Sequence, residues 1–176
     1  MNFITVDDLK LYQRKYTEDE KMDALVQTFC DSGMEAVKSY LGYDPELQEY
    51  TEEKYGMDGL RLSLSAPVNE ILSLSAGDEE QDLSLFYFCE NYIKHKARNL
   101  FKSGTLYTVS YTGGFEEVPA KIKTAALQVA SLYWESAGGN LAVSSTSFAD
   151  TGSRVFNNFQ AGRFLAEIQD YRILRL

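Results

Sequence analysis

Apolar residues recur at intervals of three and four along residues 17–41, which is the spacing of one buried face of a helix. The members of this stripe are Met22, Leu25, Val26, Phe29, Cys30, Ala36, Val37, Tyr40 and Leu41. Gly42 follows directly and is expected to end the helix, because glycine readily adopts the left-handed conformation found after helix C-termini. The pattern therefore predicts one long helix whose apolar side is buried.

Two helix starts are indicated near the beginning of the chain. Thr5 stands three residues before Asp8, and Thr17 stands three residues before Glu20. A hydroxyl and a carboxylate at this spacing can each bond the other's backbone N–H at a helix N-terminus. A short first helix is expected ahead of the long one.

The hydrophobic period changes from about 3.6 to 2 over residues 47–112. The segments LRLSLSAPV and EILSLSAG alternate apolar and polar residues, while LSLFYFCENYI and TLYTVSY add aromatic and β-branched side chains. Gly77-Asp78 and Ser103-Gly104 supply turns between them. This region is predicted to be a β-rich antiparallel insert.

The segment that leaves the insert is predicted to be a strand, a sharp turn and a helix. Tyr111 ends an alternating stretch, and Gly113 and Gly114 permit backbone conformations that side chains disfavour. Pro119 suits the first turn of a helix, where its missing N–H costs no bond. The helix that follows carries an apolar stripe with small residues, which permit close packing: Ile122, Ala125, Ala126, Val129, Leu132 and Tyr133.

Residues 139–161 lack a clear period and are rich in serine, asparagine and glycine. Such a long irregular segment is uncommon inside a compact domain, so it is predicted to be a flexible arm that orders against a partner. Its isolated aromatic residues, Phe148, Phe156 and Phe159, are candidate partner contacts; the alternative is that they fold back onto their own domain. Helical spacing returns over residues 162–176, where a C-terminal helix is expected.

Together these elements predict an α+β fold in a single domain, 1–176. The expected core is mainly helical, with about four helices, and the antiparallel β-element is inserted between the second and third long helices. A chain of 176 residues with 44% hydrophobic content is large enough for one sizeable core.

Charge adds a constraint on partners. The net charge is −9, which argues against a general nucleic-acid binder. Residues 82–104 reverse the sign, with Lys94, Lys96 and Arg98 as candidate partner contacts. Three interpretations stay open for this cluster: solvation of a hairpin tip, contact with an acidic neighbouring subunit, and contact with DNA.

The sequence offers little support for catalysis. It has no phosphate-binding loop, dinucleotide-binding turn, nucleophile elbow or zinc-protease motif. His95 is expected in an exposed turn, and Cys30 and Cys89 are expected as buried reduced thiols. We therefore predict no catalytic, cofactor-binding or metal-binding residues and no cofactor. No apolar run is long enough to cross a bilayer and no signal segment is recognisable, so a cytoplasmic chain without a membrane partner is expected.

Four segments in this order resemble the head-to-tail connector (adaptor) proteins of long-tailed double-stranded DNA phages and prophages. They are TVDDLKLYQRK, DALVQTFCDSGMEAVKSYLG, VSYTGGFEEVPAKIKTAALQVASLYWES and FLAEIQDYRIL. The third is the most specific: a strand ending in Tyr111-Thr112 passes through Gly114 and Phe115 to a helix begun by Pro119. The pair Tyr171-Arg172 matches the end of the family's last helix.

This resemblance implies a structural role in the virion neck, after synthesis in the host bacterial cytoplasm. The implied assembly is a homo-oligomeric ring, dodecameric in the virion, in contact with the portal protein and with a stopper or tail-completion protein. DNA would pass through the ring without sequence-specific binding. The joint formed by Tyr111, Gly113, Gly114, Phe115 and Pro119 would connect a β-element to a core helix in each wedge.

Three other classes remain as alternatives. A cytoplasmic enzyme without a recognisable motif would need a pocket with converging polar groups, and a sequence-specific DNA binder would need a basic recognition helix. The third class is a neighbouring neck component, such as a stopper or tail-completion protein. A stopper would be predominantly a β-barrel without long flanking helices, and the helices predicted at 17–41 and 119–137 argue against it.

Overall fold

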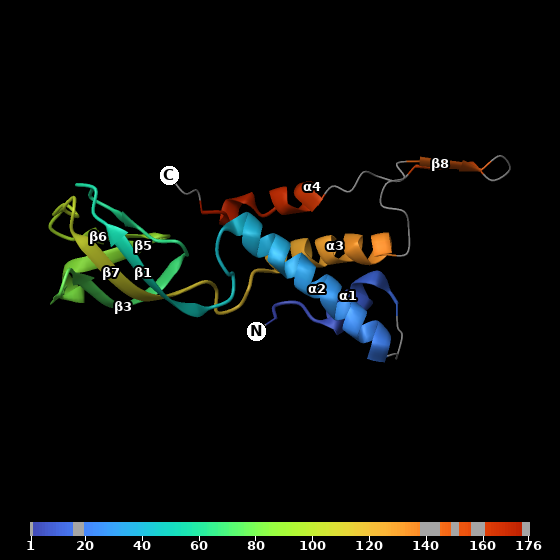
Figure 1. Cartoon of the computed structure of the whole chain (residues 1–176), viewed down its shortest axis with the longest axis horizontal. Helices are drawn as coiled ribbons and strands as arrows, with labels where there is room; N and C mark the ends of the chain where they lie inside the picture. The colour runs from blue at the N-terminus through green and yellow to red at the C-terminus, as the bar shows by residue number, and fades with distance from the viewer. Residues whose placement is uncertain (1, 16–19, 138–144, 149–151, 156–160, 174–176) are drawn as a thin grey trace. The chain divides into compact units, whose positions relative to one another are not determined.

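The computed structural model describes residues 2–15, 20–137, 145–148, 152–155 and 161–173 (Figure 1). The chain forms two compact units. The first, which we call the helical unit, comprises Met1–Tyr40 and Pro119–Tyr171. The second, the β-unit, comprises Leu41–Val118 and Arg172–Leu176. Both helices and antiparallel sheets are present, which confirms the α+β prediction.

The helical unit is built from helices α1 (Val6–Gln13), α2 (Glu20–Leu41, whose last residue belongs to the β-unit), α3 (Ala120–Ala137), α4 (Ala161–Ala166) and the 3-10 helix η2 (Gln169–Tyr171). Helix α1 begins as predicted, since the Asp8 backbone N–H donates to Thr5 Oγ1 at 3.2 Å and the Thr5 N–H donates to Asp8 Oδ2 at 2.8 Å. The second predicted cap, Thr17, lies outside the described residues. None of the described helices is long and apolar enough to span a bilayer.

The core of the helical unit comes from the apolar stripes seen in the sequence. The fully buried side chains there include Leu9, Val26, Cys30, Val37, Ile122, Val129 and Ile168. Leu25 is an exception to the predicted stripe of α2, since it is 47% exposed. Gln13 of α1 donates hydrogen bonds to Ser131 and, at 3.1 Å, to Glu135, which ties α1 to α3.

Helices α2 and α3 approach closely where small residues meet. A Cβ at Gly33 would lie 2.6 Å from the Ala126 carbonyl oxygen and 2.9 Å from Ala130 Cβ. Both alanines are buried, and Ala126 belongs to the predicted stripe. The crossing therefore depends on the missing side chain at Gly33, because a backbone oxygen cannot move aside as a flexible side chain can.

The β-unit contains two antiparallel sheets. The larger has the strand order β1-β7-β3-β4, from β1 (Gln48–Tyr55), β7 (Leu106–Gly113), β3 (Val68–Ala76) and β4 (Glu79–Glu80). The smaller has the order β2-β6-β5, from β2 (Leu62–Ser63), β6 (Tyr92–His95) and β5 (Phe86–Cys89), which follows the 3-10 helix η1 (Leu83–Leu85). These strands occupy the insert predicted over 47–112, and Gly77 and Gly104 lie in turns with positive φ.

A shared core lies between the inner faces of the two sheets. Leu74, Val109 and Tyr111 of the larger sheet and Ile93 of the smaller are fully buried. Phe101 bridges them, since its ring centroid lies 6.2 Å from Phe86 and 5.2 Å from Tyr107. The β-unit is thus a two-layer structure with one inner and one outer face on each sheet.

Strands β8 (Ser145–Phe148) and β9 (Gly152–Val155) form an antiparallel hairpin within the segment predicted as a flexible arm. Phe148 pairs with Gly152 at its closed end. In place of one continuous helix over 162–176, α4 ends at Ala166 and η2 follows. Bonds of the 3-10 type tighten this end, for example from the Ile168 N–H to the Leu165 oxygen at 3.1 Å.

Replacing Gly33 by alanine should lower the stability of the helical unit. Alanine is favoured over glycine inside a helix by about 1 kcal/mol. Overpacking at the Ala126 oxygen should outweigh this gain, with a net loss of about 1 to 2 kcal/mol and a fall in Tm of several degrees. Thermal unfolding followed by circular dichroism checks the prediction. The matched control is Gly162→Ala in α4, where no atom lies within 4 Å of the added Cβ, and its Tm should be unchanged or higher. A Gly33→Ala protein as stable as wild type would contradict it.

Candidate functional site

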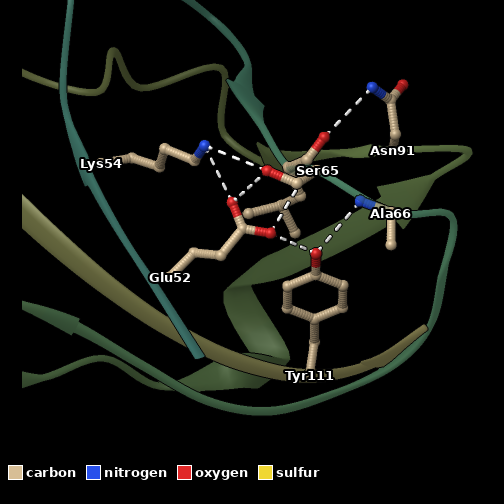
Figure 2. A network of polar contacts seen from close by, with 7 residues as sticks. Glu52, Lys54, Ser65, Ala66, Asn91 and Tyr111 are labelled. Carbon is tan, nitrogen blue, oxygen red and sulfur yellow. Dashed lines mark hydrogen bonds and ion pairs between the residues drawn. The ribbon is translucent and has the colours of Figure 1, made fainter. Parts of the chain in front are cut away.

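The β-unit side of the predicted joint is centred on Tyr111, which is fully buried on β7. Its hydroxyl donates to Glu52 Oε1 of β1 at 2.5 Å and accepts from the Ala66 N–H at 3.2 Å (Figure 2). One phenol therefore joins two strands of the larger sheet and the segment between β2 and β3. Because the group is buried, its hydroxyl depends on these partners in place of water.

Glu52 gathers four hydrogen-bond donors, although its side chain is only 13% exposed. Besides Tyr111, they are the Ser65 N–H at 3.0 Å, the Ser65 hydroxyl at 2.8 Å and Lys54 Nζ at 2.8 Å. Figure 2 shows the carboxylate between these groups. Burial alone raises the pKa of Glu52, but the bonds from Lys54, Tyr111 and Ser65 outweigh it and hold the pKa below its usual value. For Tyr111, burial and the adjacent Glu52 carboxylate raise the pKa.

The network extends to the turn between β5 and β6. The Asn91 side chain donates to the Leu64 oxygen at 3.3 Å, and the Leu64 N–H donates to the Asn91 oxygen at 2.7 Å. The Val68 N–H donates to the Glu90 oxygen at 2.7 Å. The connection between β2 and β3 is therefore held from both sheets.

Tyr50 stacks on Tyr111, with ring centroids 5.2 Å apart and an interplanar angle of 15°. Its hydroxyl accepts from the Gln48 side chain at 2.8 Å and donates to the Asp44 oxygen at 3.4 Å. Burial raises the pKa of Tyr50. The stack places the segment that leaves α2 beside the end of β7.

Gly113 and Gly114 lie in a crossing of two backbone segments, and only Gly114 has positive φ, at 97°. A Cβ at Gly114 would lie 2.3 Å from the Glu46 oxygen, and a Cβ at Gly113 would lie 2.8 Å from the Pro67 oxygen. Thus Gly113 is required for close approach, whereas Gly114 is required both for close approach and for its conformation.

Backbone hydrogen bonds close this crossing on both sides. The Phe115 N–H donates to the Pro45 oxygen at 2.9 Å, and the Leu47 N–H donates to the Phe115 oxygen at 3.2 Å. The Asn69 side chain donates to the Gly114 oxygen at 2.7 Å. The chain entering the insert and the chain leaving it are therefore tied together inside the β-unit.

Pro119 stands immediately before α3 and not within its first turn as predicted. Its carbonyl accepts from the N–H groups of Ile122 at 2.9 Å and Lys123 at 3.1 Å, so it occupies the cap position. Proline fits there equally well, because that residue's own N–H makes no intrahelical bond.

The predicted basic cluster is divided among different surroundings. Lys94 lies on β6 with Nζ 5.0 Å from the centre of the Tyr92 ring. Lys96 donates to the Ser84 oxygen at 2.6 Å. Arg98 has a φ of 59° and lines a groove of about 710 Å³ on another side of the β-unit. Lys94 instead shares its surface with Arg61, whose guanidinium lies 4.6 Å from the same Tyr92 ring. These two residues are far apart in sequence, so the sequence did not predict that they are neighbours.

His95 ends strand β6 and does not lie in an exposed turn as predicted. Its ring packs edge-on against Phe86 at 4.9 Å, and Nδ1 accepts from the Ala97 N–H at 3.0 Å. Cys89, predicted to be buried, is exposed on β5, whereas Cys30 is buried and burial raises its pKa to about 11. Among the described residues, no group of three or more metal-ligating side chains is close enough to hold an ion.

Phe148 is placed at the end of β8, while Phe156 and Phe159 lie outside the described residues. Their role as partner contacts stays a prediction. Glu52 and Ser65 were missed at the sequence level. A signal for Glu52 exists in hindsight, since it alternates with Tyr50 and Lys54 on one face of a strand that lacks aliphatic residues.

A family model described as head completion protein matches residues 2–149. No curated protein matches the chain. The solved structures that share its fold include three from gene transfer agent particles. A chain in the neck of an empty gene transfer agent (GTA) particle computed with C6 symmetry is 15% identical, with a TM-score of 0.63, over 98% of this chain and 91% of that one.

The other two similar structures also come from such particles. A chain in the virion of a native GTA particle is 13% identical, with a TM-score of 0.64, over 98% of this chain and 91% of that one. A chain in the neck of a native GTA particle computed with C12 symmetry is 14% identical, with a TM-score of 0.59, over 97% and 92%. At these identities the likeness shows the fold.

Replacing Gly114 by alanine should destabilise the β-unit by about 1 to 3 kcal/mol, since the added Cβ meets the Glu46 backbone and the residue is strained at positive φ. Gly104→Ala is the control: its φ is 79° but nothing lies within 4 Å, so only the conformational cost applies. Denaturant unfolding of both variants measures the difference. Equal losses would show that the crossing with Glu46 contributes nothing.

Glu52→Gln should lower stability at neutral pH by roughly 1.5 to 3 kcal/mol, because four donors lose a charged acceptor. The folded pKa of Glu52 lies below its unfolded value, so the carboxylate's contribution is complete above the unfolded pKa and is lost as pH falls through the folded pKa. The difference between wild type and Glu52→Gln should therefore shrink on acidification. Urea unfolding between about pH 7 and pH 3 measures it, with exposed Glu53→Gln as control. A difference independent of pH would contradict the assignment.

Proposed function

The chain belongs to the head completion protein family, and from this membership we propose that it is a ring-forming adaptor in the neck of a phage-like particle. In this role it joins the portal vertex to the stopper or tail-completion protein, and DNA passes through the ring. The protein is a structural part of the virion and performs no catalysis. The observation that carries the proposal is the match of the head completion model over residues 2–149.

The symmetries of the similar neck structures support a ring. Those structures were computed with C6 and C12 symmetry, and twelve copies satisfy both. We therefore propose a dodecamer. Rings of identical subunits require two different, complementary surfaces on each copy, since every subunit contacts one neighbour with each.

The helices support an adaptor over a stopper. Helix α2, with 22 residues, precedes the strands of the β-unit in the sequence, and α3, with 18 residues, follows them. A stopper would consist mainly of a β-barrel without such long flanking helices. The acidic balance, −9 over the chain, also suits a component that DNA must pass without sticking.

The polar network at Tyr111 supports a structural role in preference to an enzymatic one. Glu52 and Tyr111 resemble an acid–base pair only in residue type. The carboxylate already accepts from four donors, and the raised pKa of Tyr111 keeps its proton in place at neutral pH. The pair holds strands together and is not available to a substrate.

We further propose that residues 139–161, with the helix α4 that follows, engage the portal or an adjoining subunit. The hairpin β8–β9 supports this, because a two-stranded hairpin has marginal stability alone in water and gains from a partner surface. Phe148, Phe156 and Phe159 would supply apolar contacts, each worth roughly 1.5 to 3 kcal/mol if buried, offset in part by the ordering of the segment.

Mixing the full chain with purified portal rings of its own particle should produce twelve-fold rings on the portal, visible by negative-stain imaging. Amide hydrogens of residues 139–161 should exchange more slowly once the portal is present. The control is the same chain with an unrelated phage portal, which should give neither result.

Two failures are distinguishable in this experiment. Absence of the chain from portal complexes and from particle necks would reject the adaptor role. Rings that form while exchange in residues 139–161 is unchanged would reject only the assignment of that segment to the interface.

A further inference from the structure

The outer face of the larger sheet in the β-unit is acidic and rich in hydroxyl groups. The register places Glu49 opposite Thr112, Thr51 opposite Ser110 and Glu53 opposite Thr108. The contact of 3.0 Å between Thr51 Oγ1 and Ser110 Oγ confirms that these residues share one face. Glu49, Thr51 and Glu53 are all exposed, and no basic residue is paired across β1, β7 and β3 on this face.

The outer face of the smaller sheet has the opposite character. Tyr87 pairs with Lys94 and Cys89 with Tyr92, so these four side chains point away from the buried Ile93 and Phe86. Arg61 adds a second cation over the Tyr92 ring. Lys94 Nζ lies 5.0 Å from the Tyr92 ring and 5.9 Å from the Tyr87 ring, which brings two cations and two aromatic rings into one group. Arg61 and Tyr87 are exposed, and Tyr92 and Lys94 are half-buried.

The charges of both faces are available to a partner. Among the described residues, Arg61 and Lys94 take part in no salt bridge, and neither do Glu49 and Glu53. Glu90, in the turn beside Tyr92, adds one carboxylate near this group. A guanidinium stacked on a ring still presents N–H groups at its edge, so it can bind a carboxylate while remaining over Tyr92.

Strand β1, which carries Glu49 and Glu53, is an edge strand of the larger sheet. In the order β1-β7-β3-β4, β1 has one neighbour, and its register with β7 runs unbroken over eight residues. At the opposite end of the sheet, β4 has only two residues. A long regular edge strand exposes backbone groups to a further chain, which proteins usually prevent unless the edge is used.

We propose that the Arg61–Tyr92–Lys94–Tyr87 face of one copy binds the Glu49–Thr51–Glu53 face of the next copy in the ring. This inference rests on the proposed function, and it names the surfaces by which identical copies join. The two faces belong to different sheets, so each copy offers both and the contact is heterologous, the type that closes into rings. A second copy fits the basic face better than DNA does. The face carries only Arg61 and Lys94 as cations, and the chain as a whole has a net charge of −9, which repels DNA.

The native thiol of Cys89 provides a direct test, because it lies exposed on the basic face while Cys30 is buried. Thr51→Cys places a second thiol on the acidic face. In rings assembled on the portal, a short bismaleimide should then link Cys89 of one copy to position 51 of the next. A heterologous contact gives a ladder of dimers, trimers and larger species on a denaturing gel. The control, Thr51→Cys with Cys89→Ser, should give no ladder.

Charge reversal tests the same contact without a cross-linking reagent. Arg61→Glu with Lys94→Glu should reduce assembly about tenfold or more, and so should Glu49→Lys with Glu53→Lys, since each places like charges against one another. The chain that carries all four changes should regain most of the lost assembly. Lys102→Glu with Glu79→Lys is the control, because both residues line the groove and not these faces, and its assembly should equal that of wild type.

The outcomes separate this inference from the adaptor role. Twelve-fold rings without cross-linking, or four reversals that fail to restore assembly while Tm is unchanged, would overturn the inference and leave the adaptor role standing. Dimers without larger species would show a two-fold contact and overturn it as well. Protection of Cys89 by a DNA oligonucleotide, with no ladder, would assign the basic face to DNA.

Discussion

The hydrogen bond from Tyr111 to Glu52 holds the β-unit together at a point where three chain segments meet. Tyr50 stacks on the Tyr111 ring, and the Ser65 hydroxyl also donates to Glu52. Both the phenol and the carboxylate therefore have hydrogen-bond partners in the core. A buried carboxylate costs several kcal/mol unless its partners compensate, and here the compensation requires β1, β7 and the β2–β3 connection to be in place together. The cluster therefore fixes β1, β7 and the β2–β3 connection relative to one another.

Most of the fold was predictable because local patterns carry it. The stripes of α2 and α3, the cap at Thr5 and Asp8 and the alternation along β7 depend on residues near one another in sequence. Strand β1 was covered by the predicted insert but carried no signal of its own, because QEYTEEKY has no aliphatic residue to alternate. Its strand conformation is set by pairing with β7, which is a non-local effect.

The sequence predicted the backbone turn of the joint around Gly114, but it did not predict which side chains bond to Tyr111. Gly113, Gly114 and Pro119 predicted a turn followed by a helix, and Gly114 does adopt positive φ. Gly113 is needed for a contact with Pro67, which no spacing could reveal. The basic residues show the same limit: Lys94, Lys96 and Arg98 are close in sequence but differ in surroundings, and Arg61 joins Lys94 only through the fold. Their role as partner contacts stays a prediction.

Assembly of an acidic chain into a ring requires local complementarity, because identical copies of net charge −9 repel one another at long range. Screening at physiological salt reduces this repulsion beyond about 8 Å, so the contact surface decides whether copies join. The β-unit separates its charges between two sheets: hydroxyls and carboxylates on one outer face, cations over aromatic rings on the other. In the proposed ring each interface sets two cations of one copy against two carboxylates of the next, which gives local attraction and leaves the net charge of −9 per copy unchanged. That negative surplus remains to face passing DNA. The two-layer architecture matters for this reason, since a shared core, in which the Glu52 carboxylate is paired with Lys54, lets one small unit present two chemically opposite outer faces.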